Sequence, residues 1–145
     1  MDNVATFSCS IGTTDGSAGL GMEIWFDEEQ IFNSDHIMDT IKFQHIFNDN
    51  DAEHELKFIM KNKTIEHTQL DESDNITNDV FLTVTDMAFE DMPLGYAVTE
   101  QAVYTHDFNG TKSTTNTQFF GEMGCNGTVS LQFTTPIYMW LLGHI

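Results

Sequence analysis

The chain has no arginine. Its five lysines stand against 23 aspartates and glutamates, so the 145 residues carry a formal net charge of −18. Proteins that bind nucleic acid need a basic surface to neutralise phosphates, and anionic membranes attract basic segments. We therefore expect no nucleic acid and no membrane among the partners.

Cysteine and long apolar runs are scarce as well. The two cysteines, Cys9 and Cys125, match no spacing typical of zinc or redox sites. We expect two free thiols, and a disulfide between them is the alternative. No apolar run approaches the ~20 residues of a membrane-spanning helix, and the N-terminus lacks the pattern of a signal peptide.

Catalytic motifs are also missing. The sequence contains no Gly-x-Ser-x-Gly elbow, no glycine-rich phosphate loop and no zinc-like spacing among its six histidines. Glu23 and Glu55 are carboxylates of the type used in glycoside hydrolysis, but nothing in the sequence places them at the separation that this reaction needs. We expect a protein that is not an enzyme.

Alternation of apolar and polar residues is the main pattern that is present. Residues 54–61 and 128–134 show the period of two that is typical of a half-buried strand. Each segment places three large apolar side chains on one face. We expect all six of these side chains in one core: Leu56, Phe58, Met60, Val129, Leu131 and Phe133.

Strands alternate with polar turns along most of the chain. Further strands are predicted in residues 21–26, 41–47, 79–89 and 96–104. A helical period is missing, and only residues 34–40 allow a helical turn. This pattern favours an all-β fold, an antiparallel β-sandwich that is jelly-roll-like. We predict a single sandwich domain over residues 20–145, preceded by an extended N-terminal arm over residues 1–19.

The arm and the C-terminal tail are the predicted partner-binding segments. The arm is polar, and its apolar anchors Val4, Phe7 and Ile11 suit addition to the sheet edge of a neighbouring chain. An edge strand of the chain's own domain is the alternative. The tail is almost wholly apolar, so Trp140 and Leu141 need cover either from their own core or from a partner.

Two acidic turns, residues 49–53 and 71–75, offer clustered carboxylates. Calcium takes oxygen ligands from such loops, and Asp49, Asp51 and Glu53 alternate suitably. The spacing of an EF-hand is missing, and acidic turns are frequent in a chain this acidic. We expect no resident cofactor, with calcium at the first turn as the alternative.

Trp25 falls on the polar face of its predicted strand. An exposed tryptophan on a sheet can stack on the ring of a glycan or fill a partner's pocket. Cover by a second sheet or a loop is the alternative, which we favour because single exposed aromatic residues are common.

Four stretches carry a family resemblance: HEL at 54–56, KTIEHT at 63–68, FGEMGCNGTV at 120–129 and TPIYMWLL at 135–142. In these stretches the chain resembles small virion-type proteins of marine tailed bacteriophages, including those of cyanobacteria. The resemblance implies a structural protein of the virion, made in the host cytoplasm and assembled in many copies with other virion proteins. Capsid decoration and a tail or fibre adaptor are both open.

A second resemblance, to calcium-dependent carbohydrate-binding β-sandwiches, rests on residues 22–26, 49–53 and 54–61. It implies a glycan-binding module with calcium in an acidic turn. We therefore expect a non-enzymatic structural component of a phage particle first, and a glycan-binding module second.

Overall fold

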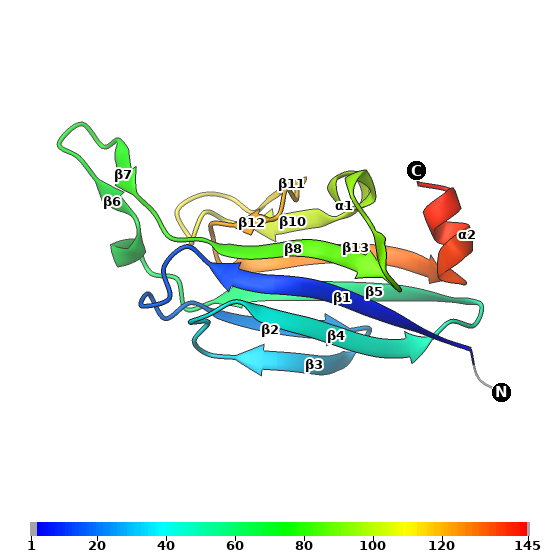
Figure 1. Cartoon of the computed structure of the whole chain (residues 1–145). Coiled ribbons are helices and arrows are strands. Elements are labelled where there is room, and N and C mark those ends of the chain that lie inside the picture. Colours follow the sequence, from blue (N-terminus) through cyan, green and yellow to red (C-terminus); the bar gives the residue numbers. More distant parts are fainter. Residues whose placement is uncertain (1–2, 145) are drawn as a thin grey trace.

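The computed structural model describes residues 3–144, which fold into a sandwich of antiparallel β-sheets (Figure 1). The prediction of an all-β sandwich is thereby confirmed. The first sheet has the strand order β12-β8-β1-β4, with β9 paired to β8, and the second has the order β11-β10-β13-β5-β2-β3. The strands of the first sheet are β1 (Val4–Thr13), β4 (Ile41–Asn48), β8 (Leu82–Phe89), β9 (Met92–Pro93) and β12 (Glu122–Met123). Those of the second are β2 (Gly21–Phe26), β3 (Glu29–Ser34), β5 (Ala52–Lys61), β10 (Val103–His106), β11 (Thr115–Gln118) and β13 (Gly127–Thr135).

Short elements flank the sandwich. The 3₁₀-helix η1 (Ile65–His67) leads into a small ribbon of β6 (Gln69–Leu70) and β7 (Ile76–Asn78), which pairs with neither sheet. This ribbon projects from one end of the sandwich, whereas α2 (Ile137–Leu142) lies at the opposite end, on the same side as α1 (Tyr96–Gln101) (Figure 1). Residues 69–78, part of which reads as a polar loop in the sequence, thus form a hairpin.

The core lies between the inner faces of the two sheets. Strands β13 and β5 pair antiparallel, so the predicted inward residues of both strands stand side by side. All six side chains expected in one core are at most 2% exposed, which confirms that prediction. Phe7 of the first sheet meets Phe58 of the second edge-on, with 6.1 Å between the ring centroids.

The N-terminal arm predicted for residues 1–19 is wrong. Residues 4–13 form β1, an interior strand of the first sheet that pairs with β4 on one side and β8 on the other. Ala5, Phe7, Cys9 and Ile11 alternate along this strand and are buried. The intervening outward residues are mostly small and polar, which gave the segment the composition of a flexible arm. Residues 1 and 2 of the predicted arm lie outside the described residues.

Strand β8 changes its inward side halfway along. Leu82 and Phe89 are both fully buried, although an odd number of positions separates them. The pairing of β8 with β1 shifts register between Ser8 and Ser10, and Asp86 takes a φ of 55°. A β-bulge adds one residue to a strand and so moves the residues beyond it to the other face. The strand predicted over residues 79–89 is thus β8, and the regular alternation of a strand is interrupted at the bulge.

Residues 96–104, predicted as one strand, divide between α1 and β10. Gly95 precedes the helix with a φ of 51°, a conformation that glycine adopts without steric cost. Ala97 and Val98 turn inward from α1 and are buried. A helix of six residues is too short to display a clear 3.6-residue period, so the sequence pattern did not reveal it. Residues 34–40, where a helical turn was allowed, contain none.

Candidate functional site

Four of the five residues predicted to contact a partner lie inside the domain. Phe7 and Ile11 are fully buried on β1, and Trp140 and Leu141 of α2 are less than a tenth exposed. The prediction of partner contact is therefore wrong for these four side chains, because the chain's own core covers them. Val4 is exposed at the start of β1 and remains accessible.

Asp49, Asp51 and Glu53 lie at the turn between β4 and β5. The Oδ1 atom of Asp49 accepts a hydrogen bond from the backbone N–H of Ile137 at 2.8 Å, which satisfies a free N–H at the start of α2. Within residues 3–144, no group of three His, Cys, Asp or Glu side chains is arranged to hold a metal ion. Asp49 thus ties the turn to the C-terminal helix, and calcium at this turn stays a prediction.

Trp25 is half-buried on the outer face of the second sheet, between the buried residues Ile24 and Phe26. Its indole Nε1 donates to Oε1 of Glu23 at 3.0 Å, and the same oxygen accepts from Nε2 of Gln30 at 2.9 Å. The ring is therefore held beside a carboxylate and a carboxamide. Groups of these kinds also bind sugar hydroxyls, so Trp25 remains a candidate glycan contact.

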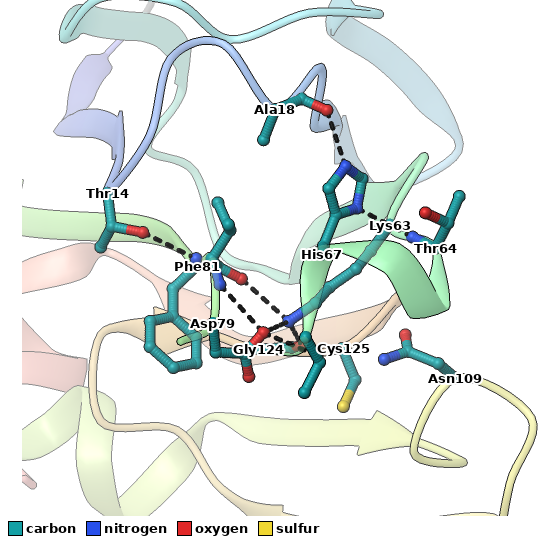
Figure 2. Close-up of polar contacts among 12 residues, drawn as sticks. Thr14, Ala18, Lys63, Thr64, His67, Asp79, Phe81, Asn109, Gly124 and Cys125 are labelled. Carbon is teal, nitrogen blue, oxygen red and sulfur yellow. Dashed lines mark hydrogen bonds and ion pairs between the residues drawn. The ribbon is translucent and has the colours of Figure 1, made fainter. Parts of the chain in front are cut away.

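A buried lysine joins three segments that are distant in the sequence (Figure 2). The Nζ atom of Lys63 donates to Oδ1 of Asp79 at 2.6 Å, to the carbonyl oxygen of Val80 at 2.9 Å and to that of Gly124. Its side chain is fully buried, and the three protons of the ammonium group each have an acceptor. No donor is left for a ligand, so this cluster stabilises the fold.

His67 is held in the same region by two backbone groups (Figure 2). The N–H of Thr64 donates to Nδ1 at 2.9 Å, so in the neutral ring Nε2 carries the proton and donates to the carbonyl oxygen of Ala18 at 2.8 Å. Both ring nitrogens are engaged. His67 therefore links η1 to the loop that contains Ala18, and it has no free lone pair to act as a base.

Neither thiol is poised as a nucleophile. Cys9 and Cys125 are free cysteines, as the sequence indicated. Burial raises the pKa of the Cys9 thiol to about 12, and burial also raises the pKa of Cys125. Because the thiolate is the reactive form, both side chains are unreactive near neutral pH.

Helix α2 is apolar on every side but buried on only one. The buried positions follow the spacing of one helical face: Ile137, Trp140 and Leu141. The other three side chains are exposed: Tyr138 by 57%, Met139 by 69% and Leu142 by 67%. A surface helix ordinarily turns polar residues outward, and this helix has no charged or amide side chain to turn. We call Tyr138, Met139 and Leu142 the α2 patch.

A hollow of about 500 Å³ adjoins the α2 patch, because Gly143 and His144 in its wall directly follow Leu142. Helix α1 supplies the opposite wall, where Tyr96 is 83% exposed. The lining residues are Leu94, Tyr96, Ala97, Glu100, Gly143 and His144. The lining therefore comes from α1, from Leu94 before it and from the two residues that follow α2. The sequence analysis named Trp140 and Leu141 in this segment, whereas the exposed side chains are those of Tyr138, Met139 and Leu142.

Comparison of the chain with protein-family models, curated proteins and solved structures found no match. Across residues 3–144, no helix has the length and apolar character needed to cross a bilayer. A function has to be inferred from the arrangement of the residues themselves.

Proposed function

We propose that this protein is a non-enzymatic structural component of a tailed-phage virion, attached to another virion protein through the α2 patch. The supporting observation is that Tyr138, Met139 and Leu142 are exposed together on a helix without a polar face. Apolar side chains that gather on the surface of a highly charged chain are typical of protein interaction sites. The resemblance of the sequence to marine phage proteins supports the particle as the place of assembly.

The partner is a different protein rather than a second copy of this chain. Each copy carries a formal charge of −18, so two copies repel one another. The hollow beside the α2 patch adds Glu100 to this negative field. A neutral or basic surface with an apolar groove complements both the patch and the charge. Many copies then bind to a repeated partner, each through its own α2 patch.

The proposal is tested by replacing Met139 and Leu142 together with glutamate. Full burial of one such apolar side chain contributes roughly 1.5–3 kcal/mol, so two introduced charges remove most of the attraction and add a desolvation cost. Tagged chain is supplied during infection by the phage that encodes it, and purified particles are analysed by quantitative mass spectrometry. Wild-type chain should be present and the double variant depleted.

The matched control replaces the exposed Ile65 and Ile76 near the projecting β6–β7 ribbon with glutamate. These residues lie at the end of the sandwich opposite to α2 (Figure 1), so this variant should enter particles as wild type does. Circular dichroism shows that both variants are folded. Equal incorporation of all three chains, or absence of the wild-type chain from particles, would refute the proposal.

Glycan binding is the second candidate, supported by the hydrogen-bonded Trp25 on an open sheet face. The indole, the Glu23 carboxylate and the Gln30 amide offer an apolar surface beside polar groups, as sugar sites do. Binding to a glycan array that is lost in Trp25→Ala but kept in the α2 double variant would support this function. An array without any saturable binding would eliminate it.

A further inference from the structure

Two asparagines of the chain directly precede a glycine, in the pairs Asn109–Gly110 and Asn126–Gly127. A glycine leaves its backbone nitrogen open to the carboxamide of a preceding asparagine, because it has no side chain to shield that nitrogen. The two pairs have different surroundings. Asn109 and Gly110 are exposed in the loop between β10 and β11, whereas Asn126 and Gly127 are half-buried at the start of β13.

The loop holds the amide groups of Asn109 and Gly110 between two hydrogen-bond partners. The backbone N–H of Gly110 donates to Oδ1 of Asp107 at 2.8 Å, and it is shared with the Asp107 carbonyl oxygen at 3.2 Å. Oδ1 of Asn109 accepts from the backbone N–H of Asn126 at 2.9 Å. A carboxylate therefore lies at a nitrogen from which it can take a proton, and a donor lies at an oxygen on which it can stabilise negative charge.

Asn126 is held in a way that opposes reaction with its own glycine. Its Oδ1 accepts from the backbone N–H of Lys63 at 3.0 Å, and its Nδ2 donates to the carbonyl oxygen of Lys63 at 2.8 Å. Gly127 is closely packed, since a Cβ built there would clash with the carbonyl oxygen of Thr105. The carboxamide of Asn126 can turn toward Gly127 only by breaking both bonds to Lys63. By contrast, no atom of residues 3–144 within 4 Å would meet a Cβ built at Gly110.

We propose that Asn109 is a site of spontaneous deamidation and that Asp107 is the general base of this reaction. The carboxylate of Asp107 takes the proton of the Gly110 N–H, and the freed nitrogen attacks Cγ of Asn109. Nδ2 receives that proton and leaves as ammonia, so that a succinimide ring closes between the two residues. Water from the solvent then opens the ring. Attack at Cγ gives aspartate, and attack at the main-chain carbonyl carbon gives isoaspartate. One asparagine and one water thus become one acidic residue and one ammonia.

The experiment compares the two asparagines within the same folded wild-type chain, incubated at physiological pH and temperature. Digestion and mass spectrometry should detect conversion of amide to acid at Asn109 and none at Asn126. The NMR signal of the Asn126 backbone N–H should shift in step with the reaction, because isoaspartate moves the acceptor of that N–H. In guanidinium chloride both asparagines should react, since unfolding removes the bonds that hold Asn126.

Asp107→Asn keeps an acceptor near the Gly110 N–H but removes the base. It should slow deamidation at Asn109 by about a hundredfold near neutral pH, the lower end of what a positioned general base contributes. The rate in this variant should then rise about tenfold per pH unit, because hydroxide alone removes the proton, whereas the wild-type rate should change little between about pH 6 and about pH 8. The matched control, Asp91→Asn in the turn between β8 and β9, should react as wild type does.

The comparison within the wild-type chain tests the site even if Asp107→Asn does not fold. Unmodified Asn109 or equal modification of both asparagines in the folded chain would overturn the proposal. A difference between them that persists in guanidinium chloride would also overturn it, because the local sequence would then be the cause. The same holds for a folded Asp107→Asn variant with the rate and pH profile of wild type.

Discussion

Lys63 and Asp79 form a buried ion pair, with 2.6 Å between Nζ and Oδ1, at the point where the ends of three strands meet. Lys63 follows β5, Asp79 precedes β8, and the third acceptor, Gly124, lies between β12 and β13. The pair therefore links the two sheets of the sandwich at one end. Because the two backbone carbonyls also accept from Nζ, the charge is neutralised and all its protons are bonded.

Replacing Lys63 with methionine should destabilise the fold strongly. The variant keeps the aliphatic volume but leaves Asp79 and two carbonyl groups without their donor, and breaking one side of a buried pair costs roughly 3–5 kcal/mol. Chemical denaturation monitored by fluorescence measures this loss. The exposed Lys112→Met is the matched control and should change the free energy of unfolding by less than about 0.5 kcal/mol. Similar values for both variants would show that the ion pair contributes nothing.

The acid sensitivity of the fold should depend on Asp79. Burial opposes the ionisation of this carboxyl, but hydrogen bonds from Lys63, Thr68 and the Val80 N–H outweigh it and hold the pKa below its usual 3.8. A group with a lowered folded pKa stabilises the fold above its unfolded pKa, near 4, and loses this contribution as pH falls through the folded value.

Asp79→Asn removes that titration. The stability gap between wild type and Asp79→Asn should therefore be full at about pH 5 and shrink below about pH 4. Denaturation curves over this range give the comparison, and Glu72→Gln should run parallel to wild type throughout. A gap that stays constant down to about pH 3 would contradict a role for Asp79 in acid unfolding.

Phe133→Ala should cost on the order of 3–5 kcal/mol, as is typical for a large aromatic side chain removed from a core. Phe133 is 2% exposed and packs against Phe89 with 4.8 Å between the ring centroids. Thermal and chemical unfolding measure the loss. Phe120→Ala is the matched control, because Phe120 is 73% exposed and its removal leaves no cavity. Equal effects at the two positions would be incompatible with the sandwich core.

Deleting residues 2–13 should leave the chain unfolded. The deletion removes β1, which separates β4 from β8 in the first sheet and contributes Phe7 and Ile11 to the core. Near-ultraviolet circular dichroism and amide NMR dispersion report the outcome. As a control, a short glycine–serine linker in place of residues 69–78 should leave the sandwich folded, since the β6–β7 ribbon pairs with neither sheet. If the chain folds without β1, residues 2–13 are not needed for the domain, as the prediction of an N-terminal arm implied.

The fold class and much of the core could be predicted from the amino-acid sequence alone. Residues 54–61 and 128–134 alternate strictly, and a strand with one buried face can be read from such a period alone. Two elements were not predicted correctly, and in both cases the cause is the local sequence. Strand β1 alternates too, but its outward positions hold small polar residues, and α1 is shorter than two helical turns. The bulge at Asp86 inverts the later half of β8, and a positive φ at an aspartate has no signature in the pattern.

The positions of the sites depend on contacts between residues that are distant in the sequence. Residues 137–142 are apolar throughout, so their composition could not show that Trp140 faces the core while Met139 faces water. That choice depends on where β13 and the Asp49 turn place the helix, which is set by contacts between residues far apart in the chain. The same holds for Lys63, whose acceptors include two backbone carbonyls, a group that every residue possesses. The sequence gives the type of each side chain, but distant residues come close to one another only when the two sheets pack together.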